Sequence, residues 1–185
     1  MRKEIFTSND RVWRFWLLLV VTSAVLTLEN FGDFSTSVPS LLKSSGGLPI
    51  LDMRFWYTPV EAYRLFDALG QAGRAENRLL YLSVDIVIPL LSSMLLWLTI
   101  SRGALRKWRY FALLGGSCDY LENVDILILL ASYPTHLDSL VTVTALFTQL
   151  KFVFYGLGIV LAIIGLILKL LRRKSPVRSA DVVEG

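Results

Sequence analysis

The chain has 185 residues, a net charge of +4, a hydrophobic content of 54% and a mean hydropathy of +0.56. This composition excludes an ordinary soluble domain and predicts an integral membrane protein, because so apolar a chain would expose too much apolar surface to water. One cysteine excludes an intramolecular disulfide, and one histidine excludes a multi-histidine metal site. We therefore expect no metal and no cofactor.

Four segments are long and apolar enough to cross a hydrocarbon core of about 30 Å, which takes roughly 17 to 25 residues. They are residues 12–28, 79–101, 110–133 and 141–171. The first also fits a cleaved signal peptide, because it has a basic start and an apolar middle. We predict an all-α, multi-pass fold in which residues 1–174 form a bundle of four transmembrane helices and residues 175–185 form a cytoplasmic tail.

Residues 29–78 separate the first two spans. Their first half is rich in Ser, Gly and Pro, which is typical of a loop. Thr58, Pro59 and Glu61 then form a typical helix start, and apolar residues recur at helical spacing as far as Leu69. This pattern predicts an extracytoplasmic amphipathic helix on the membrane surface or across the mouth of the bundle. A helix that merely packs on the bundle fits the pattern equally well.

Basic residues gather in three regions, residues 2–14, 102–109 and 169–178. The positive-inside rule assigns these regions to the cytoplasm, so both termini are predicted to be cytoplasmic and residues 29–78 extracytoplasmic. The positive charge thus reflects membrane topology, and we expect no nucleic-acid partner.

The second span places Tyr81, Asp85 and Pro89 on one helical stripe. Pro89 has no amide hydrogen, so the carbonyl of Asp85 loses its helical partner and the helix should kink. An acid and a free carbonyl at one level predict a ligand or ion site. A packing kink with a hydrogen-bonded acid remains the alternative.

The third span carries Asp119, Glu122, Asn123 and Asp125 within two turns, on one predicted side of the helix. An ionised acid at the centre of a membrane helix costs about 2.5 to 3.5 kcal/mol, so such residues usually face a bundle interior. The alternative is that this helix lies shallow, with its acids among the lipid headgroups.

The fourth span has a stripe of polar and small residues at spacings of three and four, which predicts the seam of a packed bundle. The stripe consists of Thr144, Thr148, Lys151, Tyr155, Gly158, Ala162 and Gly165. Lys151 lies at the depth of Glu122 and Asp125, which predicts an ion pair with one of them; the alternative is a lysine that reaches the interface.

These stripes predict one interior cavity that opens toward the extracytoplasmic side. Its candidate ligand-binding residues are Asp85, Glu122, Asp119, Asn123, Asp125, Lys151, Tyr81 and Tyr155.

The acid Glu29 at the end of the first span, the YTPVE sequence at residues 57–61, and Asp85 before Pro89 accompany the four spans. This layout resembles the EXPERA family, which includes the emopamil-binding sterol isomerases and the sigma-2 receptor. The resemblance implies a cavity for a sterol or cationic amphiphile, with Glu29 and Asp85 among its contacts. The DYLENVD sequence at residues 119–125 is not a pattern of that family, and no histidine is placed for isomerisation.

The leading functional hypothesis is a membrane protein whose acidic cavity binds a lipid, a sterol or a cationic amphiphile. One alternative is an intramembrane enzyme in which paired carboxylates, such as Asp85 and Glu122, transfer a proton. A small proton-coupled transporter or an accessory subunit of a larger complex is another. Membrane lipids are the expected surroundings, and the sequence leaves open whether the chain forms a homodimer.

The predicted topology can be tested with cysteines introduced one at a time and labelled from either side of the membrane. A cysteine at residue 105 should react from the cytoplasmic side, and cysteines within residues 29–78 should react from the other side. Labelling of residue 105 from outside would overturn the predicted topology.

Overall fold

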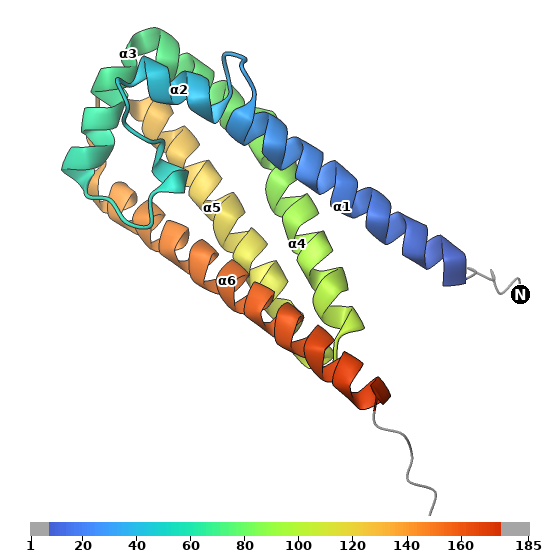
Figure 1. Cartoon of the computed structure of the whole chain (residues 1–185). Helices are drawn as coiled ribbons and strands as arrows, with labels where there is room; N and C mark the ends of the chain where they lie inside the picture. The colour runs from blue at the N-terminus through green and yellow to red at the C-terminus, as the bar shows by residue number, and fades with distance from the viewer. Residues whose placement is uncertain (1–7, 175–185) are drawn as a thin grey trace, which may run out of the picture.

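The structure, a computed structural model, describes residues 8–174 and the side chains of residues 12–172; the predicted tail, residues 175–185, lies outside this range. The predicted all-α class is confirmed. Helices α1, α4, α5 and α6 run along the molecule, and α2, η1 and the first half of α3 cover one end (Figure 1). The elements are α1 Ser8–Phe31, α2 Val38–Ser44, the 3-10 helix η1 Leu51–Met53, α3 Pro59–Leu82, α4 Val84–Arg102, the 3-10 helix η2 Arg106–Trp108, α5 Tyr110–Ser132 and α6 Asp138–Lys174.

Within the described residues, three stretches are long and apolar enough to cross a membrane: Val12–Phe31, Pro59–Arg102 and Asp138–Arg172. The protein is therefore a helical membrane protein. Helix α5 is not among the three, because every membrane-length stretch of it contains Asp119, Glu122 and Asp125. The count of four spans stays a prediction, and α5 depends on its neighbours α4 and α6 to enclose its acids.

The start of α3 follows the predicted cap. The amide of Thr58 donates to Glu61 Oε2 at 2.8 Å, the Thr58 hydroxyl accepts from the amide of Glu61, and Pro59 begins the helix. The apolar periodicity seen in the sequence stops at Leu69, but the helix does not end there or at the glycines that follow, Gly70 and Gly73. Gly70 changes its direction through a φ of +61°, a conformation that glycine adopts without steric penalty, and the helix then continues to Leu82.

The apolar face of α3 packs into the protein's own core. Its side chains meet residues of α2, η1, α5 and α6 at the covered end of the bundle. This arrangement matches the alternative of a helix that packs on the bundle, and an orientation along the membrane surface stays a prediction. The buried α3 residues in this core are Ala62, Tyr63, Leu65, Phe66, Leu69, Leu80 and Tyr81.

The predicted second span, residues 79–101, is divided in the structure. Helix α3 ends at Leu82 and α4 begins at Val84, because Ser83 adopts a non-helical conformation (φ −118°, ψ −85°). Pro89 lies inside α4. The break in this region therefore comes before the proline, at the point that brings Asp85 into the first turn of α4.

Two glycines let α5 approach its neighbours closely. A Cβ on Gly115 would lie 2.9 Å from the ring of Tyr155 on α6, and a Cβ on Gly116 would lie 2.1 Å from Ser93 Oγ on α4. Gly156, which also lies in a helix, has no such neighbour within 4 Å. The register of α5 against both helices thus depends on the absence of a side chain at Gly115 and Gly116.

We expect Gly116→Ala to destabilise the protein by about 1 to 3 kcal/mol, because overpacking forces side chains or backbone to move. Gly156→Ala is the matched control and should be neutral or slightly stabilising, since alanine favours a helix over glycine. Thermal unfolding in detergent measures both. Equal melting temperatures for the two variants would show that α4 and α5 do not meet at Gly116.

Candidate functional site

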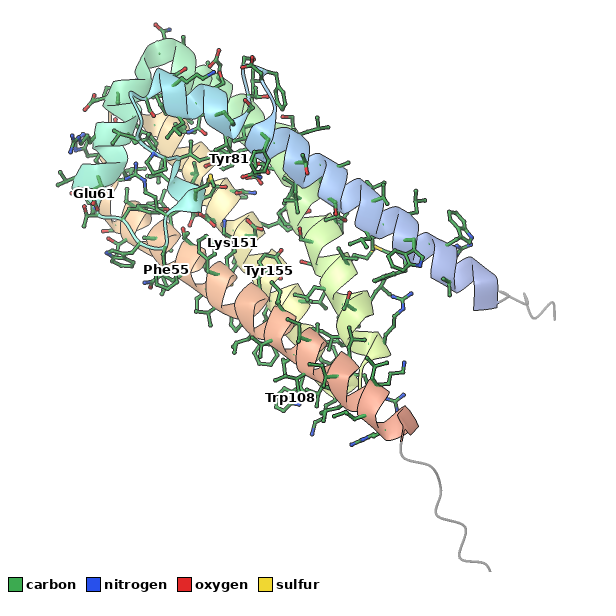
Figure 2. The ribbon with its side chains drawn as sticks, in the orientation of Figure 1. Phe55, Glu61, Tyr81, Trp108, Lys151 and Tyr155 are labelled. Carbon is green, nitrogen blue, oxygen red and sulfur yellow. The ribbon has the colours of Figure 1, made fainter. Side chains whose placement is uncertain are left out.

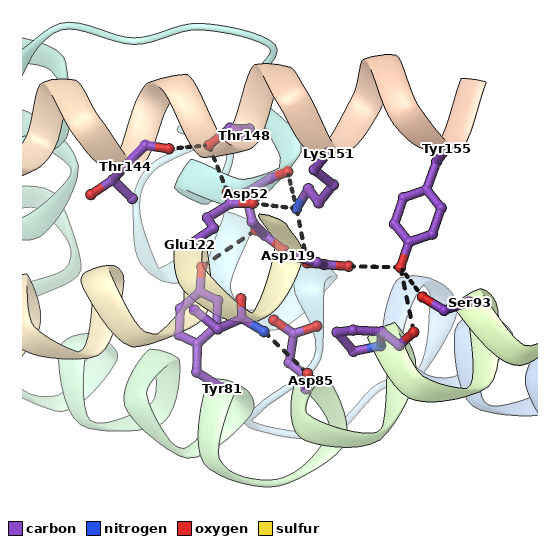
Figure 3. Close-up of polar contacts among 12 residues, drawn as sticks. Asp52, Tyr81, Asp85, Ser93, Asp119, Glu122, Thr144, Thr148, Lys151 and Tyr155 are labelled. Carbon is purple, nitrogen blue, oxygen red and sulfur yellow. Dashed lines mark hydrogen bonds and ion pairs between the residues drawn. The ribbon is translucent and has the colours of Figure 1, made fainter. Parts of the chain in front are cut away.

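Lys151 on α6 lies at the centre of a buried polar cluster. Its ammonium is 2.7 Å from Glu122 Oε2, 3.4 Å from Asp119 Oδ1 and 3.3 Å from the carbonyl oxygen of Asp52 (Figure 3). The side chain is only 7% exposed. Of the two ion pairs that the matched depths allow, the structure contains the one with Glu122, and Asp119 is a second carboxylate partner.

Glu122 is completely enclosed by this cluster. Its second oxygen, Oε1, accepts a hydrogen bond of 2.7 Å from the hydroxyl of Thr148, which in turn lies 3.4 Å from the hydroxyl of Tyr57. Burying an ion pair is tolerated only when hydrogen bonds satisfy the remaining atoms, and Thr148 provides one of them. Glu122 therefore joins α5 to α6 and is not exposed to a ligand.

Asp125 does not belong to this cluster. It is half-buried, its Oδ2 has no hydrogen-bond partner, and it forms no ion pair with Lys151. The predicted alternative pairing of Lys151 with Asp125 is therefore absent from the structure. The physical reason is the helix period: a step of three residues advances about 300°, so Asp125 is turned about 120° away from Asp119.

Asp85 is also buried, but its carboxylate lacks the partners that Glu122 has. It is 4% exposed, its Oδ2 has no partner, and in Figure 3 its carboxylate points toward Asp119. Its backbone carbonyl, which the proline leaves without a helical partner, accepts from Asn123 Nδ2 at 3.1 Å. The predicted free carbonyl is thus occupied by a packing contact, whereas the carboxylate remains available.

The two predicted tyrosines have different roles. The hydroxyl of Tyr155 lies 3.2 Å from Ser93 Oγ, 3.4 Å from the carbonyl oxygen of Pro89 and 3.5 Å from Asp119 Oδ2. Tyr81 is fully buried and its hydroxyl donates to Asp52 Oδ1 at 3.4 Å. Tyr155 therefore connects α6 to α4 and α5, while Tyr81 connects α3 to Asp52 in η1.

A cavity of about 650 Å³ lies beside this cluster, between α1, α4 and α6. One part of its wall is acidic, with Glu29, Asp52, Asp85 and Asp119 around Lys151. The remainder is largely apolar, with walls from three helices. These apolar lining residues include Leu26, Ile88, Leu95, Leu96, Ile159, Ile163 and Leu166.

The apolar part of the cavity is open to the surroundings of the bundle. Leu26 on α1 is 37% exposed, and Ile159 and Ile163 on α6 are 52% and 53% exposed. The acidic part is closed by contrast, since Glu29, Asp85 and Asp119 are each at most 6% exposed. An amphiphile could therefore place its polar group among the acids and its apolar body against these helices.

Four of the eight predicted ligand-binding residues line this cavity, and four do not. Those lining it are Asp85, Asp119, Lys151 and Tyr155. Those outside its lining are Tyr81, Glu122, Asn123 and Asp125. Sequence reasoning missed Asp52, because no periodicity around it assigns its side chain to a face, and Ser93, because no pattern indicates its contact with Tyr155.

No family model matches the chain, and no curated protein or solved structure is similar to it. The resemblance to the EXPERA family therefore stays a prediction. The two positions to which the resemblance assigns ligand contacts, Glu29 and Asp85, both line the cavity. Within the described residues, no group of three or more His, Cys, Asp or Glu side chains has a geometry that could hold a metal ion.

A double-mutant cycle tests the central ion pair. Lys151→Leu should destabilise the protein in detergent by about 3 to 5 kcal/mol, because it leaves a buried carboxylate without its cation. Adding Glu122→Gln should restore part of that loss. Chemical or thermal unfolding of the four proteins in the cycle gives the coupling energy.

Asp125→Asn provides the matched control for this cycle, since Asp125 lies on the same helix but does not contact Lys151. Its effect should simply add to that of Lys151→Leu. Additive behaviour of Glu122→Gln, or coupling to Asp125 in its place, would contradict the observed pairing.

Proposed function

We propose that the protein binds an amphiphile within its helical bundle, in the class of lipids, sterols and cationic amphiphiles. The observation that carries this proposal is the division of one cavity into a closed acidic part and an open apolar part. The polar group of the ligand lies among Glu29, Asp85 and Asp119, and its apolar body lies along α1, α4 and α6.

The charges around the cavity favour a cationic or hydrogen-bond-donating polar group. Lys151 is the one cation in the described lining, and two carboxylates and a backbone carbonyl already surround it. A phosphate would find no available cation and would face the acids of the wall. An amine would instead meet Asp85, whose Oδ2 has no partner in the protein.

The size of the cavity supports a ligand of moderate length. Small-molecule pockets usually measure about 300 to 1,000 Å³, and 650 Å³ lies in the middle of that range. A sterol or a single-chain amphiphile fits this volume. Two long acyl chains would extend beyond the wall into the surrounding membrane.

Intramembrane proton transfer is the second candidate, and the position of Tyr155 favours it. Its hydroxyl lies 3.5 Å from Asp119 Oδ2, and Tyr155, Asp119 and Asp85 all line the cavity. Such groups can give and accept protons when a substrate lies between them. Asp85 would act with Asp119 or Tyr155, because Glu122 is enclosed by Lys151 and Thr148.

A long-chain alkylamine and the corresponding neutral alcohol are suitable probes of this proposal. Asp85→Asn should weaken amine binding by roughly 1.5 to 3 kcal/mol, or about 10- to 150-fold in Kd, because it removes a charge-assisted hydrogen bond. The alcohol should lose less. Amine affinity should also fall as the pH is lowered, since protonation of the carboxylates removes the same attraction.

Asp125→Asn is the matched control for the binding experiment, because Asp125 does not line the cavity. It should leave the affinity of both probes unchanged. Tight amine binding that responds neither to Asp85→Asn nor to pH would assign the acids to packing alone. Conversion of a bound probe into a new compound would favour the catalytic candidate.

A further inference from the structure

A second hollow of about 450 Å³ lies at the opposite end of the bundle, where the loop after α4 meets the last turns of α6. Figure 2 shows Trp108 at this end and Glu61 at the other. No acidic residue lines this hollow in the described part of the chain, and four of its seven lining residues are basic. The lining residues are Ser101, Arg102, Gly103, Ala104, Arg106, Lys169 and Arg172.

The base of this hollow is fixed by contacts of α6 with the end of α4 and with the loop that follows it. The amide of Ala104 donates to the carbonyl of Gly165 at 2.9 Å, and Lys169 Nζ donates to the carbonyl of Arg102 at 2.6 Å. A Cβ on Gly103 would lie 2.9 Å from the backbone carbon of Gly165. The two segments therefore approach too closely for a side chain at Gly103. This close contact fixes the backbone positions of the basic residues relative to one another.

The four basic side chains differ in how the protein uses them. Arg102 lies over the ring of Phe15 at 3.9 Å, and Lys169 caps the end of α4. The side chains of Arg106 and Arg172 are exposed and form no hydrogen bond or ion pair with other described residues. Two guanidinium groups are thus available at the rim, and their planar donor geometry matches a phosphate group.

The surroundings of the hollow correspond to a membrane interface. Leu170 and Leu171 are each 58% exposed on α6, and Trp108, 44% exposed, lies under Lys107. Exposed leucines next to a tryptophan and several basic residues are typical of the level at which apolar chains meet lipid headgroups. An anionic group at this depth is more readily part of a lipid headgroup than of a solute dissolved in water.

We propose that this hollow binds a phosphate group, presented by the headgroup of an anionic phospholipid. Basic pockets between membrane helices commonly bind such headgroups. The proposal uses none of the residues of the acidic cavity, so it stands or fails independently of the proposed function. The two sites have opposite charge at opposite ends of the bundle, and the phosphate that the acidic cavity disfavours is the group that the basic hollow attracts.

The test uses the full chain, purified and delipidated in a neutral detergent, with native mass spectrometry and thermal unfolding as readouts. Phosphatidylglycerol should bind and raise the melting temperature, whereas phosphatidylcholine should do neither. The double variant Arg106→Gln, Arg172→Gln should weaken phosphatidylglycerol binding by about 30-fold, because it removes the attraction of two basic residues for the anionic headgroup. Both residues are exposed, so we expect this variant to fold.

The double variant Lys43→Gln, Arg64→Gln is the matched control, because it removes the same charge from exposed positions at the other end of the molecule. It should bind phosphatidylglycerol like the unmodified protein. Inorganic phosphate is tested alongside the lipids. If it binds as strongly as the lipid and this binding is lost in the Arg106 and Arg172 variant, the site is supported but its ligand is a soluble anion. Equal binding of the two lipids, or equal losses in both double variants, would overturn the proposal.

Discussion

The cost of placing carboxylates in an apolar environment is the constraint on which the structure depends. Helix α5 carries three acids, each costing about 2.5 to 3.5 kcal/mol if ionised at a membrane centre. The apolar residues around them return only about 0.3 to 0.6 kcal/mol each, so α5 is a poor membrane helix by itself. It lies between α4 and α6 in the bundle, where Lys151 and Thr148 can neutralise or bind its acids.

This requirement also determines how the remaining acids are used. Glu122 and Asp119 share Lys151, so the one buried ammonium in the cluster is already occupied. Asp85 and Glu29 arrive from other helices and line the cavity without a cation of their own. Asp119 contacts Lys151 and also lines the cavity, whereas Glu122 is enclosed and lies outside its lining. The lining therefore has more carboxylates than cations, which gives the cavity its excess of negative charge.

Sequence periodicity predicted the parts of the site that lie on regular helices. The matched depth of Lys151 with Glu122 and Asp125 predicted an ion pair with one of them, and the structure has the pair with Glu122. The Thr58 cap located the start of α3. The same reasoning failed at Asp125, since three-residue steps drift by about 60° each around the helix. Two residues three apart can therefore share one side of a helix, while a third residue at the same spacing points elsewhere.

Other features depend on contacts between segments that are distant in sequence. Asn123 satisfies the Asp85 carbonyl from α5, and no pattern within either helix indicates this pairing. Asp52 reaches the cluster from the short helix η1, and its carboxylate accepts a hydrogen bond from Tyr81. The basic hollow forms because Gly103 and Gly165 bring α4 and α6 together at their far ends, so the charges predicted as a topology signal also share one surface.

The most direct test of the central claim is to identify what the protein carries when it is extracted from its native membrane without delipidation. Mass spectrometry of the purified complex should find a stoichiometric amphiphile with an amine or hydroxyl group and no phosphate, retained with Asp125→Asn and depleted with Asp85→Asn. A phospholipid that survives Asp85→Asn belongs to the basic hollow. A phosphate-bearing lipid lost with Asp85→Asn, or a protein that carries no amphiphile dependent on Asp85, would contradict the account.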